Sequence, residues 1–268
     1  SSGIIAAKPS PFRMDVSFDV HGAPVSAWLY MPKNPSGPVP CIVMAHGFGG
    51  TKDMGLEHYA VRYHDAGFAV LVFDYRHLGE SGGEPRQLIW VPYQLEDWKA
   101  AVAYARTIKN VDPSKIALWG TSFSGGHVIA AAAKDPEIAC ISSQCPALDG
   151  RASAELMFER IGIGKGLRLI MHGQRDMVRA WFGLSPHKIP IVGKPGTIAC
   201  LTTEDAYSGY ANLASKDFIN ETCARILVRA DKYRPVEYAG NITCPVLLQI
   251  CDKDSLTPLS AALEAEQQ

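Results

Sequence analysis

Residues 115–134 read KIALWGTSFSGGHVIAAAAK, and this stretch decides the fold. The apolar run 116–119 predicts a short buried strand, and the alanine-rich run that ends the stretch predicts a helix. Ser122 therefore lies on a tight strand-to-helix turn. Such a turn strains the backbone and needs small neighbours, which Gly120 and Ser124 supply. We expect the Ser122 hydroxyl to project from the sheet edge as a nucleophile.

Two alternatives to this serine remain open. The pattern small-x-Ser-x-small also arises by chance in a chain with 24 glycines, so it is informative only with a strand before it and a helix after it. Ser124 is the competing nucleophile, but it would lie inside the helix, and we therefore prefer Ser122. The backbone amide of Phe123 would begin the helix, where an unpaired N–H can receive the oxyanion of a tetrahedral intermediate.

Overall charge excludes some classes of partner. The formal net charge is -1 and the pI is near 6.7, which is not the basic footprint of a protein that binds nucleic acid or an anionic membrane surface. The chain has no run of eighteen apolar residues and begins with no signal-peptide pattern. We expect a cytoplasmic protein with no nucleic-acid or membrane partner.

Cysteine usage supports the same compartment. The seven cysteines are odd in number and lack the close spacing of zinc ligands, and several fall in apolar runs where cysteine acts as a small hydrophobe. They are Cys41, Cys140, Cys145, Cys200, Cys223, Cys244 and Cys251. This pattern predicts a reducing environment.

Periodicity along the chain predicts an α/β protein. Alternating apolar and polar residues over 13–31 predict an antiparallel hairpin. Continuous apolar runs predict buried strands, and segments with helical spacing lie between them, so we expect a mostly parallel sheet. Strands are expected at 41–45, 68–73, 116–119, 138–144 and 244–251, and helices at 56–66, 93–108 and after Ser122.

A long insertion separates the last two strands. About a hundred residues lie between them, too many for a simple crossover, and they carry helical patterns of their own. We therefore predict a mainly helical cap at 148–241, inserted into a core made of 1–147 and 242–268. The apolar residues of the cap favour a substrate with a hydrophobic part, although such residues more often pack as core.

The second oxyanion donor is expected after the 41–45 strand. The segment His46-Gly47-Phe48-Gly49-Gly50 follows that strand directly, and its glycines let the backbone approach a ligand closely. The amide of Phe48 could join that of Phe123 at one oxygen. The alternative is an ordinary glycine-rich strand-to-helix turn.

Three motifs together resemble the α/β-hydrolase fold: residues 46–50, residues 73–83 (FDYRHLGESGG) and residues 120–126. Within that fold they resemble the branch of X-prolyl dipeptidyl-peptidase-like and dienelactone-hydrolase-like proteins, which includes fungal polyketide transferases. The resemblance covers 13–148 well and 242–262 fairly. It implies a catalytic triad, no metal or organic cofactor, and an acid at Asp254.

The triad acid has two competitors. A carboxylate is needed to fix the tautomer of the triad histidine and to stabilise its charged form. Asp252 is the near alternative to Asp254, and Asp149, after the preceding strand, is the distant one. Each could also be a solvated loop residue.

The triad histidine does not follow the acid, as the order Ser, Asp, His of this fold requires. All eight histidines precede Asp254. We expect structural roles for His46 and His127, which leaves His172 and His187 in the cap as the alternative candidates for the base. The helical pattern at the end of the chain also lacks the final strand and helix of the fold. We hypothesise that a further C-terminal segment supplies the histidine.

These residues predict a serine hydrolase that cleaves a carboxylic ester or thioester of a small molecule through an acyl-enzyme on Ser122. The first alternative is acyl or polyketide transfer through the same acyl-enzyme. The second is a binding protein that keeps the fold without catalysis. Self-association into a homo-oligomer is compatible with the sequence.

Overall fold

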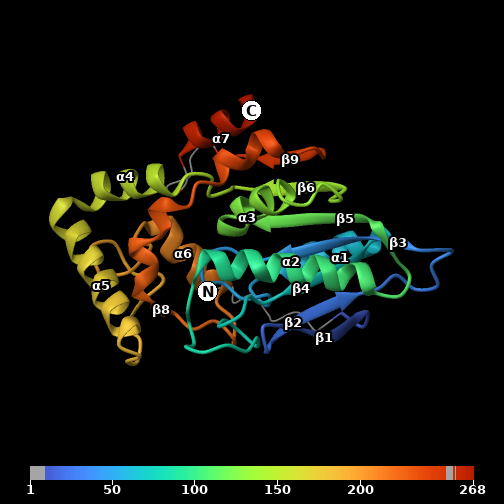
Figure 1. Ribbon diagram of the computed structural model, residues 1–268, viewed down its shortest axis with the longest axis horizontal. Helices are drawn as coiled ribbons and strands as arrows, with labels where there is room; N and C mark the ends of the chain where they lie inside the picture. Colours follow the sequence, from blue (N-terminus) through green and yellow to red (C-terminus); the bar gives the residue numbers. More distant parts are fainter. Residues whose placement is uncertain (1–9, 252–255, 257) are drawn as a thin grey trace.

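A seven-stranded, mostly parallel sheet forms the centre of the protein (Figure 1). The computed structural model describes residues 10–251, 256 and 258–268. The strand order is β1-β2-β4-β3-β5-β6-β9, with β1, β2 and β4 joined by antiparallel pairings and all other neighbours parallel. The strands are β1 (Arg13–Val20), β2 (Ala23–Tyr30), β3 (Val39–Ala45), β4 (Ala69–Phe73), β5 (Val111–Thr121), β6 (Cys140–Gln144) and β9 (Val246–Gln249).

Helices cover both faces of the sheet, which explains the continuous apolar runs of the central strands. On one face, α1 packs through Leu56 and Ala60. On the other face, Trp98 of α2 and Val128 of α3 join the larger core cluster. The bounds of these helices are α1 (Leu56–Asp65), α2 (Val91–Thr107) and α3 (Phe123–Ala132). The predicted α/β-hydrolase arrangement, including the N-terminal hairpin, is confirmed.

The segment 148–241 lies between β6 and β9 and is mainly helical, extending to one side of the sheet (Figure 1). The division of the chain into a cap with these bounds and a core stays a prediction. Its elements are α4 (Gly150–Ile161), α5 (Ile163–Trp181), β7 (Lys188–Ile189), α6 (Glu204–Leu213), β8 (Thr222–Cys223) and the 3₁₀ helices η1 (Ala224–Val228), η2 (Ala230–Lys232) and η3 (Pro235–Asn241). The last helix of the chain is α7 (Leu259–Gln267).

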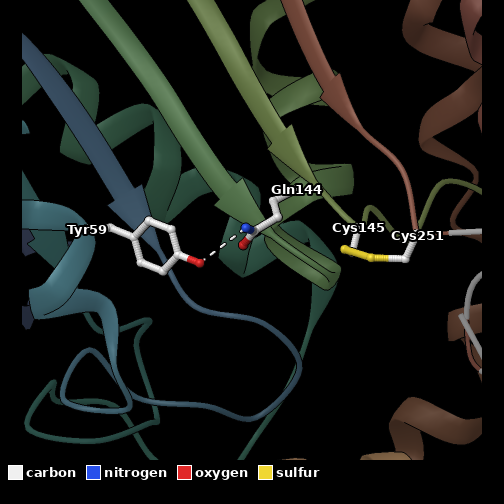
Figure 2. Close-up of a disulfide and its surroundings, with 4 residues drawn as sticks. All are labelled: Tyr59, Gln144, Cys145 and Cys251. Carbon is white, nitrogen blue, oxygen red and sulfur yellow. Dashed lines mark hydrogen bonds between the residues drawn. A yellow bond between two sulfur atoms is a disulfide. The ribbon is translucent and has the colours of Figure 1, made fainter. Parts of the chain in front are cut away.

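A disulfide joins Cys145 to Cys251, with a Cα–Cα distance of 5.6 Å (Figure 2). It connects the residues that follow β6 and β9, two neighbouring strands. The expectation of unpaired cysteines in a reducing environment was wrong for this pair, because parallel strands bring together residues that are 106 positions apart. A cytoplasmic location stays a prediction, and the disulfide counts against it.

No helix within the described ranges combines the length and the apolar composition that crossing a bilayer would require.

Candidate active site

Ser122 occupies the turn between β5 and α3 and has the strained backbone that the sequence predicts. Its φ is 53° and its ψ is -113°, a region that non-glycine residues rarely adopt. Two backbone hydrogen bonds hold the turn: the Ser122 N–H donates to the carbonyl oxygen of Gln144 and the Ala147 N–H donates to that of Ser122, both at 2.9 Å. The end of β6 and the residues after it therefore hold Ser122 in its strained conformation.

Small neighbours are required at this turn because the backbone of α3 passes close both to the end of β5 and to the residues that follow β6. A Cβ on Gly120 would overlap the carbonyl oxygen of Ser124, and a Cβ on Gly125 would lie 2.9 Å from Cα of Pro146. Only glycine fits at both positions.

Ser124, the competing nucleophile, is committed to structural hydrogen bonds. Its side chain is fully buried. Its hydroxyl donates to the carbonyl oxygen of His46 and also bonds the hydroxyl of Tyr75, which in turn accepts from the indole N–H of Trp98 at 2.8 Å. Ser124 thus ties the segment 46–50 to α3.

Phe48 and Phe123 lie beside Ser122, as the oxyanion hypothesis requires. Their rings meet edge to face with centroids 5.4 Å apart, and the position of a Cβ on Gly47 would be 3.7 Å from Oγ of Ser122. Within the part of the chain that the structure describes, neither the Phe48 nor the Phe123 amide N–H has a hydrogen-bond acceptor. Their role as oxyanion donors stays a prediction.

Ser122 opens into a cavity of about 210 Å³ between the sheet edge and the segment 148–241. Phe48 and Phe123 border it from the sheet side. Apolar side chains of α4 and η1 form most of the opposite wall, and the charged Arg160 and Asp231 lie exposed at its rim. The larger aliphatic side chains that the inserted segment contributes to the lining are Leu156, Met157, Ile161, Leu201, Ile226 and Leu227.

The predicted triad acid Asp254 and its near competitor Asp252 lie outside the described residues. Asp149, the distant competitor, is used elsewhere: its carboxylate caps α4 by accepting from the Arg151 and Ala152 amides and pairs with Arg234 at 2.9 Å. These partners hold the pKa of Asp149 below its ordinary value against the effect of burial.

His46 and His127 are both buried and hydrogen-bonded, which fits the structural roles expected for them. His46 accepts from the Gly47 amide at Nδ1 (2.7 Å) and contacts the Met54 carbonyl through Nε2 (3.1 Å). His127 bonds the Tyr233 hydroxyl at 2.7 Å and the Gln94 amide oxygen at 2.8 Å. Burial lowers the pKa of His46, and it lowers that of His127 to about 3.

His172 and His187 form a pair in the inserted segment. Their rings stack with centroids 5.0 Å apart, and Nδ1 of His172 lies 2.7 Å from Nε2 of His187. Neither residue is among those that line the cavity at Ser122, and nor is any other of the eight histidines. Among the described residues, which include all eight histidines, the structure therefore brings no histidine into the cavity of the nucleophile.

One contact to the site has no signal in the sequence. The hydroxyl of Tyr210 on α6 donates to the carbonyl oxygen of Phe48. The two residues are 162 positions apart, so no local pattern could have predicted their contact.

The motif at 73–83 supports the segment 46–50 rather than the reaction itself. Lys52, just after that segment, is fully buried and donates through Nζ to Asp74 at 2.7 Å and to Glu80 at 2.6 Å. Gly79 has a φ of +53°, and a Cβ there would overlap the Asp74 carboxylate. No cluster of three or more metal-ligating side chains exists among the described residues.

Comparisons with known proteins agree with this geometry. Quorum-quenching protein AidA of Acinetobacter baumannii is 41% identical over 252 residues, which are 93% of this chain and 81% of that protein. Thiohydrolase aneE of Aspergillus aculeatus is 39% identical over 118 residues, 44% of this chain and 37% of that protein. The crystal structure of the α/β hydrolase GrgF from Penicillium superposes with a TM-score of 0.79 at 25% identity, covering 95% of this chain and 85% of that one.

The family match covers the second strand of the hairpin, the segment 46–50, the nucleophile turn and most of α4. It spans residues 21–159 and is described as X-Pro dipeptidyl-peptidase (S15 family). Together with the relatives above, it shows that this chain belongs to the S15 family of α/β hydrolases.

Proposed function

We propose that the protein is a serine hydrolase that cleaves a carboxylic ester or thioester through an acyl-enzyme on Ser122. The observation that carries this proposal is the position of Ser122, which sits on a strained turn at the mouth of an apolar cavity. Two amide N–H groups that lack an acceptor among the described residues lie beside it. Hydrolase relatives support the reaction class; the nucleophile and the bond cleaved are part of the proposal.

The reaction takes two steps on the same serine. Oγ of Ser122 attacks the acyl carbon and loses its proton to a base, while the carbonyl oxygen becomes an oxyanion held by the Phe48 and Phe123 amides. Collapse of this intermediate expels the alcohol or thiol, which takes up a proton. Water then attacks the acyl-enzyme through a second oxyanion, and the acid product leaves.

The base is proposed to be a histidine that Asp254 orients. The Cys145–Cys251 disulfide supports the position of the acid, because Cys251 directly precedes residues 252–254 and is tied to the end of β6. Gln144, which accepts from the Ser122 amide, is the residue before Cys145. Cys251, the last described residue before Asp252 and Asp254, is therefore held close to the turn that carries the nucleophile.

The cavity walls support a substrate with an apolar acyl or alcohol part. Leu156, Met157 and Leu227 present apolar side chains to a ligand, whereas the charged Arg160 and Asp231 are exposed and Ser153 and Thr202 add hydroxyl groups. A compact apolar group would fill the inner part of the cavity, and a polar group would remain at the opening. A small ester or thioester meets both conditions.

A serine-directed fluorophosphonate probe tests the proposal. We expect one equivalent of label on the wild-type protein and none on Ser122→Ala. Ser153→Ala is the matched control, since Ser153 is a second hydroxyl in the same cavity and its loss should leave the labelling unchanged. Intact mass of the labelled protein gives the stoichiometry directly.

Turnover of p-nitrophenyl esters and acyl thioesters of increasing chain length then tests the reaction. Hydrolysis that disappears in Ser122→Ala supports the proposal. Products formed only in the presence of an added alcohol or amine would assign acyl transfer instead. A folded full-length protein that neither labels nor turns over any of these substrates would be a binding protein.

A further inference from the structure

The helix α5 lies at the outer edge of the inserted segment (Figure 1) and exposes large apolar side chains to solvent. Trp181 is 87% exposed and Met171 is 69% exposed. Both belong to a stripe of side chains that are exposed by half or more and recur mostly at spacings of three, four or seven residues, as one face of a helix requires. We call the following residues the α5 stripe, of which the last two follow the end of the helix: Ile163, Leu167, Met171, Val178, Trp181, Phe182 and Leu184.

The opposite face of α5, which packs on η1 and α4, includes two glycines at its closest contacts. Gly166 and Gly173 are buried there. A Cβ on Gly166 would collide with the ring of Phe158, and a Cβ on Gly173 would lie 2.8 Å from Cγ1 of Val228. The helix thus approaches its own protein closely at two glycines, and Leu169 is its one large apolar side chain that is buried there, against Ile189 and Ala224. Most of its other large apolar side chains are exposed.

A buried ion pair fixes this orientation. Asp176 lies on the inner face, is fully buried, and accepts from Nε of Arg225 at 2.6 Å and from the His187 amide at 2.7 Å. Rotating the helix to bury the α5 stripe would expose the glycines and separate this carboxylate from its partners. The stripe is therefore a stable surface of the folded protein.

The exposed area matches what a protein partner covers. A whole aromatic side chain presents roughly 150–250 Å². Two largely exposed aromatic side chains and five smaller ones exposed by half or more together offer an apolar surface on the order of 800 Å². The largest apolar patch on a typical monomer is about 300–600 Å². One partner of a standard interface buries about 800 Å².

We propose that the α5 stripe is the contact surface for a second copy of this chain, paired antiparallel about a two-fold axis near Met171 and Gln174. Trp181 and Phe182 crowd one end of the stripe. At the other end, Gly162 and Gly164 have open space around their Cα atoms. In an antiparallel pair, the bulky aromatic end of each copy lies on the open glycine end of the other.

The charges of α5 give this pair a distinctive salt response. Arg168, Arg175 and Arg179 follow one edge of the stripe, whereas Asp176, the helix's single acidic residue, is engaged by Arg225. A two-fold axis perpendicular to two antiparallel helices places both basic edges on the same side of the interface. Association should therefore strengthen as added salt screens their repulsion.

An anionic membrane is the competing occupant of an apolar stripe with a basic edge. The net charge of -1 provides little long-range attraction to such a surface. The salt dependence distinguishes the dimer from the membrane-bound protein. Binding to anionic lipid weakens as the salt concentration rises, whereas association of the two α5 helices strengthens. A second copy also gives a role to the open space at Gly162 and Gly164, because its aromatic side chains would fill that space. A flat lipid surface would not fill it.

Sedimentation velocity of the full chain from 1 to 50 µM tests the proposal at 50 and 500 mM NaCl. We expect a species of twice the 29.1 kDa chain mass, with a dissociation constant that falls severalfold at the higher salt. Met171→Glu and Trp181→Glu should sediment as monomers with unchanged circular dichroism. Met14→Glu, an exposed methionine on β1, is the matched control and should remain dimeric.

Crosslinking tests the antiparallel arrangement of the two α5 helices. Gln174→Cys with a short bismaleimide should yield covalent dimer well above the background of the wild-type protein, which has the exposed Cys140. A wild-type protein that is monomeric at 50 µM would overturn the proposal, and so would a dimer that survives both α5 substitutions. Flotation of a monomeric protein with vesicles of phosphatidylglycerol, lost at 500 mM NaCl, would assign the stripe to a membrane instead.

Discussion

The hydroxyl of Tyr210 donates a hydrogen bond to the backbone carbonyl of Phe48. This contact joins α6, in the inserted segment, to the residue whose amide is the proposed second oxyanion donor. Burial raises the pKa of Tyr210 above its ordinary value, so the phenol stays protonated and remains a donor. The insertion therefore helps to position the backbone of the site as well as covering the cavity.

Tyr210→Phe should lower kcat by about fivefold, the rate equivalent of the ~1 kcal/mol that a neutral hydrogen bond contributes. KM should change little, because the cavity walls keep their shape. Tyr207→Phe, on the same helix, is the control and should leave kcat unaltered. Equal kcat values for the two variants would show that the Phe48 peptide is held by other contacts.

Gly120→Ala should destabilise the fold by about 2 kcal/mol or more, because the new Cβ overlaps the Ser124 carbonyl oxygen in the backbone of α3. Gly37→Ala is the matched change, since Gly37 has nothing within 4 Å. Urea denaturation of the two variants measures the difference. Similar midpoints would mean that α3 can shift away from β5 without cost.

Stability should fall in mild acid because of His127. Burial lowers the pKa of His127 from 6.5 to about 3 in the folded protein, so the unfolded chain takes up a proton first as the pH drops. The contribution of neutral His127 to the free energy of unfolding is fully present above pH 6.5 and is lost as the pH falls toward 3. At pH 5 the loss is about 2 kcal/mol. His46, with its pKa lowered in the same way, adds to the effect.

His127→Gln tests the origin of that pH dependence. Glutamine can keep one of the two side-chain hydrogen bonds but does not titrate. The variant should be less stable than wild type at pH 8, and its unfolding free energy should fall less between pH 7 and pH 5. If the unfolding free energy of the variant fell as much between pH 7 and pH 5 as that of the wild type, another residue would be the titrating group.

Removing the disulfide should lower stability by about 4 kcal/mol, because the bond closes a loop of 106 residues in the unfolded chain. For a chain of this size the loss corresponds to a fall in Tm of about 10 °C. The double variant Cys145→Ser/Cys251→Ser and the reduced wild type should agree. Cys140→Ser, at an exposed free cysteine, serves as the control.

Thiol titration supplies an independent check on the same bond. The unfolded, non-reduced protein should show five reactive thiols, since the free cysteines are Cys41, Cys140, Cys200, Cys223 and Cys244. Seven reactive thiols and an unchanged Tm after reduction would contradict the pairing.

Local patterns predicted the parts of the fold whose interactions are close in sequence. Alternation over 13–31 indicated the hairpin, and apolar runs indicated β3, β4 and β5, because strand and helix periods repeat within a few residues. The same holds for Ser122. Its strained turn follows from residues 120–126 alone, since Gly120 and the start of α3 meet within that stretch.

The sequence alone thus determined the backbone conformation of residue 122 and the positions of β3, β4 and β5 along the chain, since both depend on short-range sterics and periodicity. Only the tertiary structure decided that Cys145 meets Cys251, that Tyr210 reaches Phe48, and that α5 turns its glycines inward. Those contacts join residues from distant parts of the chain, or depend on which side of a helix the rest of the protein covers. A helix with one small face and one large apolar face can pack either way, and only its neighbours select between them.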